Sequence, residues 1–108
     1  MSMREAVQHE SVTDKELVRA LKALADPTRF RMVQEIASAG ELSCGELTER
    51  FDVSQPTISH HLKILLDANL LVQRTQGKHH YTSVNAELVS GLLATLPIRL
   101  TAPHKKRR

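Results

Sequence analysis

Residues 41–66 carry the signals for two helices that are separated by only a few residues. A capping box at 43–46, a hydroxyl followed three positions later by a carboxylate, predicts the start of a short helix. A tight turn is expected at 52–53, after which Ser54 caps a second helix over 55–68. A short helix, a tight turn and a longer second helix form the layout of a helix-turn-helix motif, in which the second helix enters a DNA major groove.

The second helix has one apolar and one polar face at 100° per residue. Ile58, Leu62, Leu65 and Leu66 share an arc and are expected to pack inward. The opposite face is polar and nearly free of acidic residues, so it does not repel phosphates, and its small hydroxyl side chains allow close approach to base edges. Gln55 suits an adenine edge and Lys63 a phosphate. The candidate DNA-binding residues on this helix are Ser54, Gln55, Pro56, Thr57, Ser59, His60 and Lys63.

A β-hairpin is predicted directly after this helix. Residues 70–75 and 79–84 are rich in β-forming side chains and are separated by a turn at 76–78. A short two-stranded projection after a recognition helix is a wing. We add Arg74 and Lys78, which flank its glycine, to the candidate DNA-binding residues, because they are placed to reach phosphates or the minor groove.

The remaining helices are defined by their capping signals. Thr13 opens the first helix, Asp26 followed by proline opens the next, and Gly40 ends that second helix in a left-handed conformation. Asn85 caps the last helix, which Pro97 stops. The helix that Asp26 opens is expected to bury Phe30, Val33, Ile36 and Ala37. Asn69 is expected to end the helix over 55–68. The predicted fold is mainly α with a small β-hairpin, a winged helix-turn-helix in the order α-α-α-α-β-β-α.

Length and composition limit the other classes. The 108 residues suit one domain, with a flexible N-terminus (1–12), a DNA-binding and dimerisation domain (13–97) and a basic tail (98–108). The single cysteine excludes an intrachain disulfide, and no apolar run is long enough to span a membrane, so we expect a cytoplasmic protein. Residues 104–108 alone hold four of the 15 Lys and Arg residues. No glycine-rich phosphate loop, apolar carboxylate pair or Ser/His/Asp arrangement is found, so no enzyme is expected.

Four segments together resemble the ArsR/SmtB family of bacterial winged-helix repressors, in unbroken order from Leu17 to Asn85: Ala25-Asp26-Pro27-Thr28-Arg29, Glu41-Leu42-Ser43-Cys44-Gly45-Glu46-Leu47, Ser54-Gln55-Pro56-Thr57-Ile58-Ser59-His60-His61-Leu62-Lys63 and Gly77-Lys78-His79-His80-Tyr81. The resemblance implies a homodimer, held by the first and last helices, that binds a pseudo-palindromic operator in double-stranded DNA until an inducer releases it. The two terminal helices agree with this, since their leucines offer more apolar surface than a small core needs. The candidate dimerisation residues are Leu17, Leu21, Leu24, Leu88, Leu92 and Leu96.

The sensing motifs of that family are missing. Its arsenic, lead and cadmium sensors carry a Cys-x-Cys pair where this chain has Leu42-Ser43-Cys44-Gly45, and one thiolate cannot hold a soft metal tightly. Its zinc, nickel and cobalt sensors carry Asp, His and Glu ligands on the last helix, which here has one glutamate and no histidine. We therefore predict no metal site and no cofactor. Three alternatives stay open: release by a small organic effector, release by a partner protein that masks the DNA-binding face, or autoregulation alone without an inducer.

Three questions stay open at this level. The alternative to DNA binding is a winged-helix module that pairs with proteins, although the outward face offers only Ile64 as an apolar anchor. Cys44 is either a reactive thiol near a helix N-terminus or an inert packing residue. The basic run 104–108 is either a phosphate-binding arm or a solvated tail. His61 lies at the edge of the apolar face and is expected to be structural.

Overall fold

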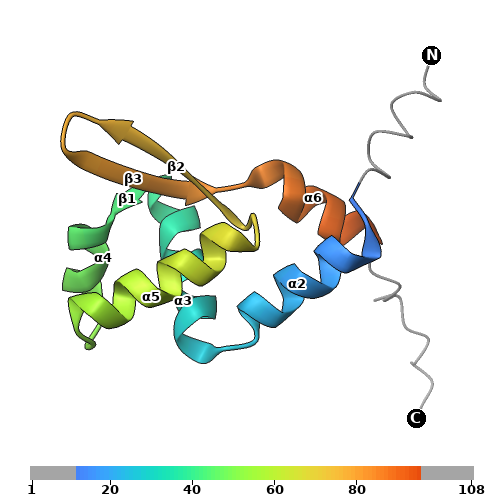
Figure 1. Ribbon diagram of the computed structural model, residues 1–108, viewed down its shortest axis with the longest axis horizontal. Coiled ribbons are helices and arrows are strands. Elements are labelled where there is room, and N and C mark those ends of the chain that lie inside the picture. The colour runs from blue at the N-terminus through green and yellow to red at the C-terminus, as the bar shows by residue number, and fades with distance from the viewer. Residues whose placement is uncertain (1–11, 96–108) are drawn as a thin grey trace, which may run out of the picture.

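The computed structural model describes residues 12–95. Its helices and strands follow the predicted order, with one additional short strand before the helix-turn-helix (Figure 1). The wing projects at one end of the molecule, while α2 and α6 lie together at the other (Figure 1). The elements are α2 (Asp14–Leu24), α3 (Pro27–Ala39), β1 (Leu42–Ser43), α4 (Cys44–Arg50), α5 (Gln55–Asp67), β2 (Leu71–Gln76), β3 (His79–Val84) and α6 (Ala86–Thr95).

The predicted caps are present at the helix starts. Thr13 and Ser43 each form a capping box with the glutamate three residues on. The side chain of Asp26 accepts a hydrogen bond from the backbone N–H of Arg29 at 3.0 Å, and Asn85 accepts one from the N–H of Leu88 at 3.2 Å. Each such bond satisfies a backbone donor that has no partner within its helix, so the helix starts are determined locally.

Two helix ends adopt positive φ values, which the sequence analysis predicted for Gly40 but not for Asn69. Gly40 follows α3 with φ of 89°, and Asn69 follows the end of α5 with φ of 65°. Glycine adopts this region without steric cost, and asparagine is among the side chains that tolerate it best. The chain thus turns sharply after α5 and enters the wing.

The sheet has three antiparallel strands in the order β1-β3-β2. In the wing, Gln76 pairs with His79, so Gly77 and Lys78 form the two-residue loop at its tip. The additional strand β1 pairs Leu42 with Thr82, and the buried Thr82 hydroxyl donates a hydrogen bond to the Leu42 carbonyl at 3.0 Å. A two-residue strand has no periodic pattern, which is why the sequence analysis predicted only the hairpin.

The core is aliphatic, and α5 crosses it. Ile58, Leu62 and Leu65 are buried as predicted, and Leu66 packs at the edge of the core. The expected inner stripe of α3 is only partly right. Among its four residues Ile36 alone is fully buried, while Phe30 is 49% exposed, Ala37 is exposed and Val33 is half-buried. The fully buried Met32, one turn before Ile36, takes the place that Phe30 was expected to fill.

The cap at Asp26 gives a pH-dependent prediction for stability. The hydrogen bond from the Arg29 N–H, together with the charges of Arg29 and His61, lowers the pKa of the Asp26 carboxyl against a smaller raising effect of desolvation. A carboxyl with a lowered pKa in the folded state adds stability above its pKa in the unfolded chain and loses that contribution as the pH falls through the lowered value.

We expect Asp26→Asn to flatten the loss of stability on acidification from about pH 5 to 3, because asparagine caps equally well but does not titrate. Urea unfolding at a series of pH values measures this. Asp52→Asn is the matched control, since it removes an exposed aspartate from the α4–α5 turn without removing a helix cap. An unchanged pH dependence in Asp26→Asn would contradict the proposed effect of the cap.

Candidate nucleic-acid interface

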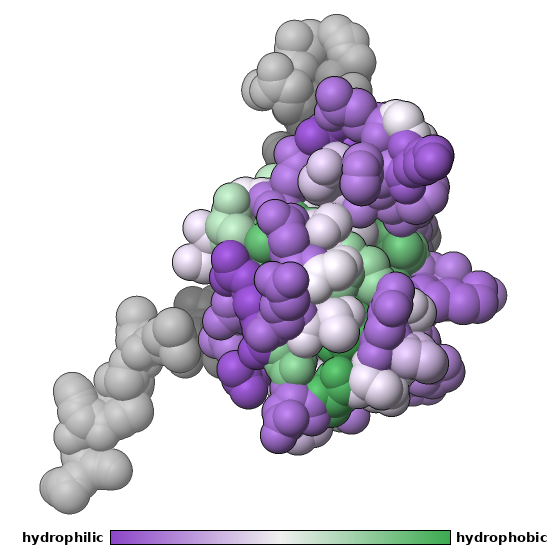
Figure 2. All heavy atoms as spheres, turned by 90° about the vertical axis from the view of Figure 1, so that its left-hand side faces the viewer, coloured by the Kyte–Doolittle hydropathy of each residue, from purple (hydrophilic) through white to green (hydrophobic). Residues whose placement is uncertain are grey.

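The burial of one face of α5 determines which face is free. Because Ile58, Leu62 and Leu65 point into the core, the opposite side of the helix faces solvent. Gln55, Pro56, Ser59, His60 and Lys63 are all exposed there. Figure 2 shows the end of the molecule that carries α4, the start of α5 and the wing tip, and its surface is mainly hydrophilic with small hydrophobic areas between. The first turn of α5 contains no acidic residue, so the positive end of its dipole stands uncompensated.

Two of the candidate hydroxyls are already used within the protein. Ser54 is the N-cap of α5 and accepts a hydrogen bond from the Thr57 N–H, and the two hydroxyls lie 3.0 Å apart. Thr57 is half-buried. Ser54 and Thr57 therefore hold the start of the helix, which leaves Gln55 and Pro56 as the exposed side chains of its first turn.

Ser59 connects α5 to α4. Its hydroxyl oxygen lies 3.6 Å from the sulfur of Cys44, the first residue of α4, and Cys44 is half-buried. The two helices of the motif thus meet through these two small side chains.

The basic candidates differ in how much of their charge is free. Lys63 pairs with Asp67 one turn along α5 at 3.3 Å, but both side chains are well exposed, so the pair is weak and readily exchanged for a phosphate. Lys78 lies at the exposed tip of the wing. Arg74 lies in the middle of β2 opposite Tyr81, where it donates to the Glu41 carboxylate at 2.8 Å and stacks over the Tyr81 ring at 4.7 Å. The structure therefore separates Arg74 from the tip that it was expected to flank.

The candidate dimerisation residues fall into two groups. Leu17, Leu88 and Leu92 are at most 8% exposed within the single chain, so they belong to its own interior. Leu24 is half-buried, Leu21 is 40% exposed, and Leu96 lies outside the described residues. The structure adds two exposed apolar side chains that the sequence analysis did not select, Val18 on α2 and Leu93 on α6. Helical periodicity identified the leucines but could not show which of them the chain itself covers.

Arg29 is a further residue that the sequence analysis did not single out. Its guanidinium donates to the Ala23 carbonyl at 2.6 Å and lies 3.2 Å from the ring Nδ1 of His61 on α5. His61 is half-buried, in agreement with its predicted structural role. The only signal in the sequence was the position of Arg29 three residues after a helix-capping aspartate, which does not reveal a partner 32 residues away.

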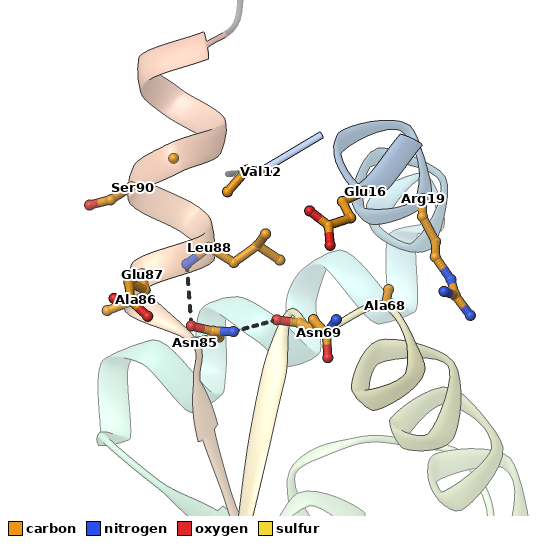
Figure 3. Close-up of a pocket in the computed structure, with 11 residues that line it drawn as sticks. Val12, Glu16, Arg19, Ala68, Asn69, Asn85, Ala86, Glu87, Leu88 and Ser90 are labelled. Atoms are coloured by element: carbon orange, nitrogen blue, oxygen red, sulfur yellow. Dashed lines mark hydrogen bonds between the residues drawn. The ribbon is translucent and has the colours of Figure 1, made fainter. Parts of the chain in front are cut away.

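A hollow of about 850 Å³ lies between α2, the α5–β2 junction and α6 (Figure 3). Asn85 spans its base, where its side-chain amide donates to the Asn69 carbonyl at 2.9 Å and accepts from the N–H of Leu88. The charged groups on the rim, Glu16, Arg19 and Glu87, are all exposed. None of the polar or charged side chains among its lining residues is fully buried.

Neither a membrane span nor a metal cluster is found in the part of the chain that the structure describes. Within residues 12–95, none of the helices combines the length and the apolar character that crossing a membrane requires. The same residues contain no cluster of three or more His, Cys, Asp or Glu side chains arranged to hold a metal ion. The absence of a metal site stays a prediction for the whole chain.

Comparisons with known proteins identify the family. A model described as a helix-turn-helix domain matches residues 24–74. The chain is 44% identical over 86 residues to the arsenical resistance operon repressor of Bacillus subtilis, covering 76% of this chain and 82% of that protein. It is 38% identical over 91 residues to the protein of the same name from Staphylococcus aureus, covering 84% and 86%.

A solved structure agrees with these relatives. An ArsR-like transcriptional regulator from Rhodococcus superposes with a TM-score of 0.65 at 27% identity, covering 74% of this chain and 76% of that one. The match includes the helix-turn-helix and extends well beyond it. Sequence relatives, fold and the exposed polar face of α5 thus lead to one conclusion: the chain belongs to the ArsR/SmtB family of winged helix-turn-helix transcriptional regulators.

Proposed function

We propose that this DNA-binding repressor acts in the cytoplasm as a homodimer, and that each protomer places α5 in one of two successive major grooves of a pseudo-palindromic operator. The observation that carries the proposal is the exposed outer face of α5, which begins with Gln55 and has no acidic residue in its first turn. The two-residue tip of the wing carries Lys78, which is proposed to contact the phosphate backbone of the DNA. We propose no catalytic activity, in keeping with a family of transcriptional regulators.

A second copy of the chain is the partner that best fits the other end. Val18 and Leu21 on α2 and Leu93 on α6 are exposed, and Figure 1 places both helices away from the wing tip. An isologous contact between these helices in two protomers would leave both α5 faces free. The domain that binds DNA and dimerises is proposed to span 13–97, between an N-terminal segment and a basic tail.

The alternative, a module that binds other proteins through α5, lacks an anchor. Ile64 is the one large apolar side chain on the flank of the outer face, and it is half-buried and packed against the core. Protein interfaces usually centre on a large apolar or aromatic side chain that is free to enter a pocket.

We propose a release signal other than a soft metal. Relatives of this chain are named for arsenical resistance. Each protomer here has a single thiol, Cys44, which lies beside Ser59 and is half-buried. Arsenic and similar ions require two or three converging thiolates, which one protomer cannot supply. A small organic effector or a partner protein is the remaining class of inducer.

The proposal is tested by titrating the full chain into a labelled duplex from the region upstream of its own gene and into a scrambled duplex of equal length. We expect about 10³-fold or greater preference for the upstream duplex at physiological salt. Zinc and arsenite added in separate titrations should leave that preference unchanged. Release by zinc would reveal a metal site, and release by arsenite would show that the cysteines of two protomers act together. If the chain shows no preference for the upstream duplex, and selection from random DNA yields no preferred sequence either, the proposed function is wrong.

A further inference from the structure

One guanidinium group joins three elements behind the recognition helix. Arg29 lies in the first turn of α3, and its Nε donates to the carbonyl of Ala23 near the end of α2 at 2.6 Å. Its Nη1 lies 3.2 Å from the Nδ1 of His61 in α5. The N–H of the same residue donates to the Asp26 cap. Arg29 therefore links the proposed dimerisation helix α2 directly to the helix that is proposed to enter the groove.

His61 occupies a particular place on α5. It lies between the buried Ile58 and Leu62 along the helix and is half-buried, whereas its neighbour His60 is exposed on the outer face. The two rings have centroids 6.0 Å apart. His61 therefore lies beside the outer face of α5 without belonging to it, and its contacts act on the helix that carries that face.

The contact between Arg29 and His61 requires a neutral imidazole. A guanidinium only donates hydrogen bonds, so the Nδ1 of His61 must accept, which it does only when it carries no proton. A proton on His61 would place a donor against a donor and two positive charges 3.2 Å apart. Three groups face His61: the guanidinium of Arg29, the carboxylate of Asp26 and the ring of His60. The hydrogen bond from the Arg29 N–H is the largest cause that lowers the pKa of Asp26, and the charge of His61 adds a smaller lowering effect.

We propose that Arg29 is a positioning residue for the recognition helix, which it holds through the neutral form of His61, and that a proton on His61 loosens this hold and weakens operator binding. Histidine is the side chain whose charge most often responds to pH near neutrality, so pH is the variable that tests this hold. The protonated ring is drawn toward Asp26 and away from Arg29, which breaks the link between α2 and α5. The inference rests on the proposed operator binding and adds a dependence on pH to it.

The test compares the wild-type chain with His61→Asn and with the matched control His60→Asn. Asparagine places its side-chain oxygen close to the position of Nδ1, so His61→Asn keeps an acceptor for Arg29 that never titrates. Operator affinity is measured at pH 7.5 and 5.5 at constant ionic strength. We expect the affinity ratio of wild type to His61→Asn to fall about tenfold between the two pH values, the equivalent of one hydrogen bond to a charged group. The other histidines are common to both proteins and cancel in the ratio.

The control must respond in the opposite sense. A proton on the exposed His60 adds positive charge near phosphates, so it strengthens binding at low pH, and His60→Asn removes this gain. The ratio of wild type to His60→Asn should therefore rise on acidification. Equal directions for the two variants would overturn the proposal, because the pH dependence would then come from total charge alone.

Arg29→Gln and Arg29→Lys complete the cycle. In a chain without the guanidinium, the substitution His61→Asn should no longer change the pH dependence of binding. Lysine should restore at most part of that change because it lacks the planar fork. Far-UV circular dichroism at both pH values identifies any variant that fails to fold, and Arg29→Lys then carries the test. A chain with no operator preference at pH 7.5 contradicts the proposed function itself, whereas selective binding with a constant ratio of wild type to His61→Asn contradicts only the positioning role.

Discussion

Replacing Gln55 by alanine is expected to weaken operator binding by about 1–3 kcal/mol, roughly 5- to 150-fold, while binding to random duplex changes little. Gln55 is exposed at the first position of α5, beside a cap that Ser54 and Thr57 form without it. A side-chain amide can pair with both hydrogen-bonding groups of an adenine edge, and alanine loses both contacts without disturbing the helix. Fluorescence anisotropy with the upstream duplex and with a random duplex measures the two affinities.

Two further variants distinguish contacts to the bases from contacts to the phosphates. Lys78→Ala at the wing tip should weaken both duplexes alike and reduce the salt dependence, because it removes a phosphate contact. Gln34→Ala changes an exposed glutamine on α3 and should leave both affinities unchanged. If Gln55→Ala and Lys78→Ala lower the two affinities in the same proportion, the assignment of Gln55 to base contacts is wrong.

The double substitution Leu21→Asp with Leu93→Asp is expected to convert a dimer into a folded monomer and to lower operator affinity by about 10²-fold or more. Leu21 is 40% exposed and Leu93 is 69% exposed, so neither aspartate is forced into the core of its own chain. In a dimer the same carboxylates would be buried without partners, which strongly disfavours association. A monomer then loses the gain from binding two half-sites at once, which is typically about 10²- to 10⁴-fold.

Light scattering measures the mass against the 12.1 kDa of one chain, and circular dichroism shows that the variant is folded. Phe30→Asp is the control, because Phe30 is also half-exposed but lies on α3. Leu92→Asp is unsuitable, since Leu92 is 5% exposed within the single chain and its replacement would unfold the protomer. A dimer that survives the double substitution but not Phe30→Asp would place the interface on α3.

The sequence alone was sufficient for features that depend on residues close together in the chain. The caps at Thr13, Asp26, Ser43 and Asn85 were predicted correctly because each bond joins a side chain to a backbone group three residues away. The outer face of α5 followed from the 100° spacing of its residues, since three strongly apolar positions on one side leave only one orientation. The residues of the candidate DNA-binding face are therefore predictable from the sequence.

Only the tertiary structure decided the features that depend on residues far apart. Arg74 pairs with Glu41, and Arg29 meets His61, across 33 and 32 residues respectively. Strand β1 exists because β3 lies beside it, and Met32 is buried in preference to Phe30 because of what packs against α3. Likewise, leucines at equivalent helical spacing divide into buried Leu17, Leu88 and Leu92 and the exposed Leu21. Periodicity states which side chains share a face, but the free energy of burial depends on the partner that covers the face, and the fold supplies that partner.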